Sequence, residues 1–156
     1  MKKFLVPTDF SDTAKNAARF AVQATAHIPG AVVILYHVYD KITGGSDGSP
    51  LTVDDNDKKI VLSAALESLR DDLQTVSNVT IEFDAEEGGS LIERLRKYVR
   101  HNAVDMIIMG ITGATRLEQI FMGSNSLNMV REAVCPVMIV PPNAKYKQIK
   151  NVLFAS

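Results

Sequence analysis

The chain has 156 residues, of which 46% are hydrophobic and 22% are charged, a balance typical of one globular domain rather than of a disordered chain. Its formal net charge is −1 and its basic residues are scattered, which disfavours nucleic acid and anionic membrane surfaces as partners. The single cysteine, Cys135, cannot form an internal disulfide, and the sequence shows neither a signal-peptide pattern nor an apolar run of about 18 residues, so a cytoplasmic location is expected.

Strand-like and helix-like segments alternate along the chain. Short runs rich in β-branched residues predict strands, and apolar positions spaced by three and four predict helices. Ile60 and Leu91 are expected on buried helix faces, and Ser90 with Glu93 is expected to form a capping box. The predicted elements are a strand at 4–7, a helix at 12–27, a strand at 31–38, a polar surface loop at 40–57, a helix at 57–76, a strand at 79–83, a helix from 90, a strand at 104–109, a helix from about 123 and a strand at 136–140.

This alternation predicts an α/β fold, with parallel strands joined by right-handed crossovers into one open sheet that has helices on both faces. Ligands of such sheets bind outside the carboxyl ends of the strands, where the strand order reverses. The loops after the first, second and fourth strands are therefore the expected location of a functional site.

The loop after the fourth strand carries the spacing Gly-x2-Gly-x9-Gly-Ser, formed by Gly110, Gly113, Gly123 and Ser124. Glycines let backbone amides approach an anion, and a helix starting near Gly123 would add unpaired N–H groups, so the pattern fits a polyphosphate. Each piece also has an ordinary explanation as a strand end, a turn or a helix cap. We favour the phosphate site because the joint spacing arises by chance in under roughly 1% of chains of this length.

Two further residues lie where the same crevice is expected. Asp9, after the first strand, could accept hydrogen bonds from a ribose or an adenine amino group, or could simply cap the following helix, although Ser11 and Asp12 could cap it equally well. Val38, at the end of the second strand, could offer its backbone N–H and C=O to a base edge, or serve only as core. His27 and His37 have no second metal-type ligand at a usable spacing, and Cys135 fits a buried small hydrophobe better than a nucleophile.

Three stretches of the sequence occur together: Leu5-Val6-Pro7-Thr8-Asp9-Phe10-Ser11, His37-Val38, and the glycine loop followed by Cys135-Pro136-Val137. With these stretches the chain resembles the universal stress protein family over residues 2–142, and its glycines are similar to those of the family's ATP-binding branch. The resemblance implies a Rossmann-like sheet of five parallel strands in the order 3-2-1-4-5, similar to that of the adenine nucleotide alpha hydrolases.

The resemblance also implies ATP as the ligand, with or without Mg²⁺, and a homodimer formed through the fifth strand, Val137 to Val140. Pro7 and Thr8 would line the base pocket, with Asp9 and Val38 at the ribose and adenine. The residues implied around the phosphates are Gly110, Gly113, Gly123, Ser124 and Asn125.

Three functions stay open from the sequence. The one favoured is a nucleotide-binding stress-response module whose association with a partner depends on its nucleotide. A slow ATP hydrolase is the alternative, but its only loop candidates for handling water and charge are Glu118, Gln119 and Arg116, and no catalytic residue is assigned. A domain of the same fold could also bind AMP, cyclic AMP or another anion.

The end of the chain repeats its beginning. Residues 149–156 match residues 1–8 in pattern, with a basic or polar lead, apolar strand residues, a small residue and a hydroxyl. A complete domain is expected at 1–142, so we interpret 143–148 as a linker and 149–156 as the first strand of a second, truncated repeat. The alternative is an ordinary C-terminal strand or tail.

Overall fold

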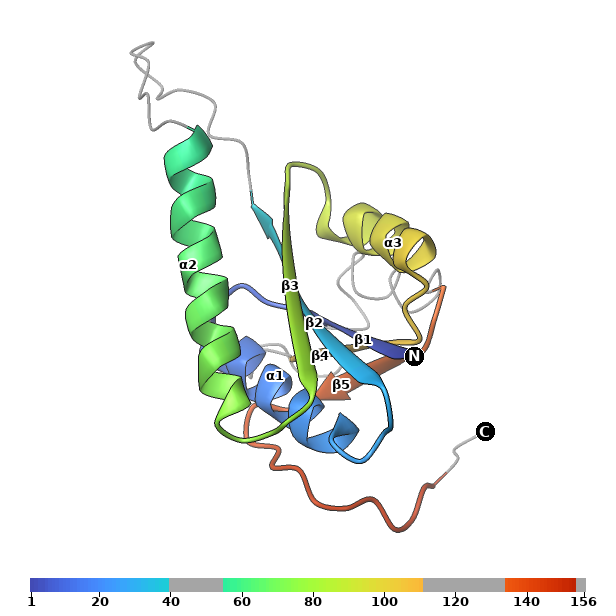
Figure 1. Ribbon diagram of the computed structural model, residues 1–156. Coiled ribbons are helices and arrows are strands. Elements are labelled where there is room, and N and C mark those ends of the chain that lie inside the picture. The colour runs from blue at the N-terminus through green and yellow to red at the C-terminus, as the bar shows by residue number, and fades with distance from the viewer. Residues whose placement is uncertain (40–54, 111–133, 154–156) are drawn as a thin grey trace.

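The structure is a computed structural model that describes residues 1–39, 55–110 and 134–153 (Figure 1). Most of the predicted loop at 40–57 and the start of the predicted helix near 123 lie outside these ranges. The alternation predicted from the sequence is confirmed. The elements in chain order are β1 (Lys2–Pro7), α1 (Asp12–Thr25), β2 (Ala31–Tyr39), α2 (Asp55–Gln74), β3 (Thr80–Glu87), α3 (Leu91–Asn102), β4 (Met106–Gly110) and β5 (Val137–Val140).

The strands form one parallel sheet in the order β3-β2-β1-β4-β5, as expected. Leu5 of β1 lies between Ile34 of β2 and Ile107 of β4, and Gly110 at the end of β4 pairs with Val140 of β5. Because all the strands run the same way, the carboxyl ends of β1, β2 and β4 lie at one edge of the sheet. This is the edge where ligands of such folds bind.

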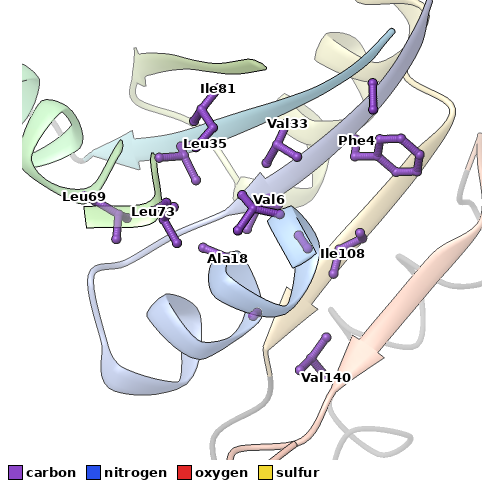
Figure 2. Close-up of a cluster of buried hydrophobic side chains, with 14 of the residues drawn as sticks. Phe4, Val6, Ala18, Val33, Leu35, Leu69, Leu73, Ile81, Ile108 and Val140 are labelled. Carbon is purple, nitrogen blue, oxygen red and sulfur yellow. The ribbon is translucent and has the colours of Figure 1, made fainter. Parts of the chain in front are cut away.

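Helices cover both faces of the sheet, α1 and α2 on one and α3 on the other (Figure 1). On the first face Val6, Val33 and Leu35 point toward the helices (Figure 2). Burying a side chain of this size stabilises the fold by about 1.5–3 kcal/mol. The second face carries a cluster made of Leu5, Val32, Ile34, Tyr36, Leu95, Tyr98, Val99, Val104 and Ile107.

Two apolar positions predicted to be buried are not. Ile60 is 59% exposed and Leu91 is 42% exposed. The buried positions of α2, namely Leu66, Leu69 and Leu73, all lie in its second half, which is the part that packs against the sheet. Helical spacing identifies the inward face of a helix, but it does not show how far along that face the contact extends.

The predicted capping box of α3 is wrong. Ser90 occupies the N-cap position, but its side chain makes no capping hydrogen bond. Arg94 stabilises this turn instead: its Nε donates to the Gly88 carbonyl at 2.7 Å, and its Nη2 donates to the Glu87 carbonyl at 2.8 Å. A third bond, from Arg94 Nη1 to Glu86 Oε2 at 3.1 Å, completes an ion pair.

The segment after β5 returns to α1. Asn16 Nδ2 donates to the carbonyls of Pro141 at 3.2 Å and Ala144 at 3.1 Å, and the ring of Tyr146 meets Phe20 edge-on at 5.6 Å. Residues 149–153 form no strand and are exposed. The repeat that begins at residue 149 stays a prediction, and residues 154–156 lie outside the described ranges. In the described parts of the chain, no helix is both long enough and apolar enough to cross a membrane.

Candidate functional site

The structure brings together the candidate residues that it describes at the carboxyl edge of the sheet. Pro7 ends β1 opposite Tyr36 of β2, and the ladder extends one step further, because Thr8 N–H donates to the Tyr36 carbonyl at 2.8 Å. Val38 follows on β2, and Gly110 ends β4. The other predicted site residues lie outside the described residues: Gly113, Gly123, Ser124 and Asn125.

A chain of hydrogen bonds fixes the turn between β1 and α1. The Oγ1 atom of buried Thr8 accepts from Phe10 N–H at 3.1 Å, while Asp9 Oδ1 accepts from the backbone N–H of Ser11 at 3.0 Å and from its hydroxyl. Ser11 is the N-cap of α1, since its Oγ accepts from Ala14 N–H at 3.3 Å. Asp9 therefore does not cap the helix itself; it holds the residue that does.

The environment of Asp9 favours its charged form. The hydroxyl of Ser11 is the main cause that lowers the pKa of the Asp9 carboxyl below its ordinary value, and the Ser11 backbone N–H and nearby His37 act in the same direction. Partial burial opposes these effects without reversing them. A charged, exposed carboxylate is a hydrogen-bond acceptor for hydroxyl or amino groups, and its lowered pKa makes it a poor general base near neutral pH.

The backbone of Val38 points to a side of β2 that β1 does not fill. Along a strand, the N–H and C=O groups of alternate residues point to the same side. The Tyr36 carbonyl accepts from Thr8 on the β1 side, and the Tyr39 carbonyl accepts from Gly88 N–H at 2.8 Å on the β3 side. The N–H and C=O of Val38 therefore face the β1 side, beyond the last residue of β1. The half-buried side chain of Val38 packs against the cluster under α3. The side chain therefore belongs to the core, while the backbone N–H and C=O do not take part in that packing.

Gly110 lies directly against the first turn of α1. A Cβ atom added at Gly110 would be 2.5 Å from the Thr13 carbonyl oxygen and 2.9 Å from the Thr13 carbonyl carbon, closer than real Cβ contacts. Packing alone therefore requires a glycine here, whether or not an anion binds. The ordinary explanation of this first glycine, as a strand end in close contact, accounts for it without a ligand.

His37 also lies at this edge, and the sequence pattern predicted no role for it at the candidate site. Its Nδ1 lies 2.7 Å from the Thr8 carbonyl oxygen, and its ring centroid lies 4.9 Å from that of Phe10. Phe10 has a φ of 63°, the left-handed conformation that a bulky residue rarely adopts. The position of His37 next to Val38 at a strand end was the available signal. Its bond to the Thr8 carbonyl could not be predicted, because that bond depends on how the ends of β1 and β2 meet in the fold.

Other candidate chemistry is sparse in the described part of the chain. Cys135 is half-buried beside the cluster under α3, and burial is the main cause that raises the pKa of its thiol. Residues 1–39, 55–110 and 134–153 contain no group of three or more histidine, cysteine or acidic side chains that could hold a metal ion.

The fold defines a class of protein: an open, parallel α/β domain, here with a carboxylate and backbone groups at the carboxyl ends of its strands. The family model of the universal stress protein family matches residues 1–141, so the chain belongs to that family. Universal stress protein MJ0577 of Methanocaldococcus jannaschii is 30% identical over 155 residues, a match that covers 89% of this chain and 94% of the relative.

Solved structures agree with the fold. The structure of MJ0577 has a TM-score of 0.64 and covers 90% of this chain and 95% of that one. A universal stress protein in complex with cAMP has a TM-score of 0.67 at 22% identity, covering 89% and 96% of the two chains. A family member from Arabidopsis thaliana with AMP bound has a TM-score of 0.63 at 20% identity, covering 92% and 94%.

Proposed function

We propose that the chain binds an adenine nucleotide, ATP, at the carboxyl edge of its sheet and acts as a stress-response regulatory module. The observation that carries this proposal is that the carboxyl edge of the sheet holds both a charged Asp9, fixed by Ser11, and the backbone groups of Val38, which face the β1 side of β2 beyond the last residue of β1. The carboxylate suits a ribose hydroxyl, and a backbone N–H beside a C=O suits the donor and acceptor on the edge of adenine.

Two similar structures support an adenine nucleotide as the class of ligand, since one holds cAMP and the other AMP. Our choice of ATP rests on the sequence of the glycine loop. In this proposal Gly110, Gly113 and Gly123 with Ser124 and Asn125 surround the phosphates, and Mg²⁺ accompanies them where three phosphates are bound. Pro7 and Thr8 line the base pocket.

The test is mass spectrometry of small molecules released from protein purified without added nucleotide, followed by calorimetric titration with ATP, AMP and cAMP. We expect ATP to be released and to bind most tightly. AMP or cAMP binding more tightly than ATP would keep the site but replace the ligand. The absence of binding by all three would refute the proposal.

We further propose that the regulatory output is association through β5. This strand pairs with β4 on one side, and among the described residues no strand pairs with its other side. An unpaired edge of this kind is a template for pairing with another chain. In a homodimer the partner would be β5 of a second copy; with a second repeat in the same chain the pairing would be internal. Sedimentation with and without ATP is expected to show a dimer, and a monomer at high concentration in both conditions would contradict this.

A further inference from the structure

The ladder between β1 and β2 stops one hydrogen bond early. Thr8 N–H donates to the Tyr36 carbonyl at 2.8 Å. In a regular parallel ladder the next bond would run from Val38 N–H to the Thr8 carbonyl, because the bonds alternate in direction along the pair. Thr8 and Val38 are both described, and this bond is not formed between them.

The Thr8 carbonyl is taken by a side chain instead. His37 Nδ1 lies 2.7 Å from that oxygen. A carbonyl oxygen can only accept, so Nδ1 carries the hydrogen and donates it. The imidazole thus bonds to the same carbonyl that a longer ladder would offer to Val38, and the Val38 N–H is left without this backbone partner on the β1 side of β2.

The same ring supports the turn that holds Asp9. Phe10 packs on the His37 ring at 4.9 Å while its own N–H donates to Thr8 Oγ1 at 3.1 Å, and these contacts accompany its left-handed backbone. Asp9 lies between Thr8 and Phe10 in the chain. His37 therefore contacts the residue on each side of Asp9.

We propose that His37 is the positioning residue for the nucleoside end of the ligand: by taking the Thr8 carbonyl it leaves the Val38 N–H for the base edge, and by supporting Phe10 it sets the position of Asp9. This inference rests on the proposed nucleotide binding and names the part of the ligand that His37 serves. It predicts an effect on adenosine, AMP and ATP alike, since all three share the nucleoside.

The first experiment compares affinities of folded variants. His37→Leu removes the donor, His37→Asn replaces it with an amide N–H close to the Nδ1 position, and His27→Leu is the matched control on an exposed histidine after α1. His37→Leu is expected to weaken adenosine, AMP and ATP by a common factor of about ten, the order expected for one lost hydrogen bond. His37→Asn is expected to recover most of this, and His27→Leu to bind as the wild type does. Equal binding by His37→Leu and wild type, or a loss confined to ATP, would overturn the proposal.

The second experiment uses amide hydrogen exchange at Val38 and does not require ligand binding by the variant. In unliganded wild-type protein the Val38 amide should exchange rapidly, and AMP should protect it. In unliganded His37→Leu protein the freed Thr8 carbonyl should bond to Val38 and slow its exchange. A protected Val38 amide in the unliganded wild type would overturn the role of His37. If the wild type binds no nucleotide, the proposed function fails, while the comparison of unliganded proteins still decides whether His37 stops the ladder.

Discussion

Replacing Gly110 with alanine tests whether this glycine is required by packing. The new Cβ would lie 2.5 Å from the Thr13 carbonyl oxygen, and both atoms belong to rigid parts of the structure, β4 and the first turn of α1. Overpacking of this kind costs about 1–3 kcal/mol, partly offset by about 0.4–1 kcal/mol from the lower chain entropy of unfolded alanine. At about 2–4 °C per kcal/mol for a chain of this size, a net loss near 1–2 kcal/mol lowers the melting temperature by about 2–8 °C.

The assay is thermal and urea unfolding of four variants, with Gly88 as the matched control. Gly88 has a φ of +69° and open space where a Cβ atom would lie. A substitution at Gly88 is therefore disfavoured by the backbone conformation and not by a steric clash. Gly88→Ala should cost about 1 kcal/mol, and Gly88→Asn should recover most of that loss, because asparagine tolerates the left-handed region. At Gly110 both alanine and asparagine should destabilise, since either side chain brings the same Cβ toward Thr13.

The reasoning would be refuted by a Gly110→Ala protein that unfolds at the wild-type temperature. If that protein had also lost ATP binding, the glycine would serve the ligand and not the contact with α1.

The remaining predictions concern the turn after β1 and the segment after β5. Asp9→Ala should weaken ATP binding about tenfold or more by calorimetry, as expected for a hydrogen bond to a charged group, while Asp12→Ala should leave it unchanged; equal losses would point to a general charge effect. Because the Asp9 pKa is lowered in the folded protein, the stability that its charge contributes is fully present above the unfolded value of 3.8 and is lost as the pH falls through the lower folded value. The stability gap between wild type and Asp9→Asn should therefore close on acidification, and a gap that widened would contradict the hydrogen-bond assignment. Asn16→Ala removes two bonds to carbonyls after β5 and should cost about 0.5–1.5 kcal/mol in urea unfolding; an unchanged midpoint would mean that these two bonds do not hold the segment to α1.

Much of the fold can be predicted from local sequence pattern. A strand that is buried on both faces of a sheet, such as β2, consists of a continuous run of apolar residues, and such a run can be recognised in the sequence. Strand order does not follow from such runs, since an apolar strand carries no mark of its neighbours, and here the order came from the family resemblance. Helical spacing can also predict too much burial. Ile60 has the spacing of a residue on a buried helix face, but it is exposed because α2 packs against the sheet through its second half.

At the candidate site, sequence reasoning found what depends on residue type and position and missed what depends on contact. Asp9 and Val38 were identifiable because one lies just after β1 and the other near the end of β2, and both strands end at the same edge of the sheet. The bond from His37 to Thr8 and the contact of Gly110 with Thr13 were not identifiable, since each joins residues far apart in the sequence that only the folded arrangement brings together.

The central claim is that this edge of the sheet binds ATP, and calorimetric titration of ATP into wild-type and Gly123→Val proteins tests it most directly. Valine at this position would occupy the space that we assign to phosphate, so we expect saturable binding by the wild type, none by the variant, and unchanged circular dichroism in both. A folded Gly123→Val protein that binds ATP with wild-type affinity would contradict the account.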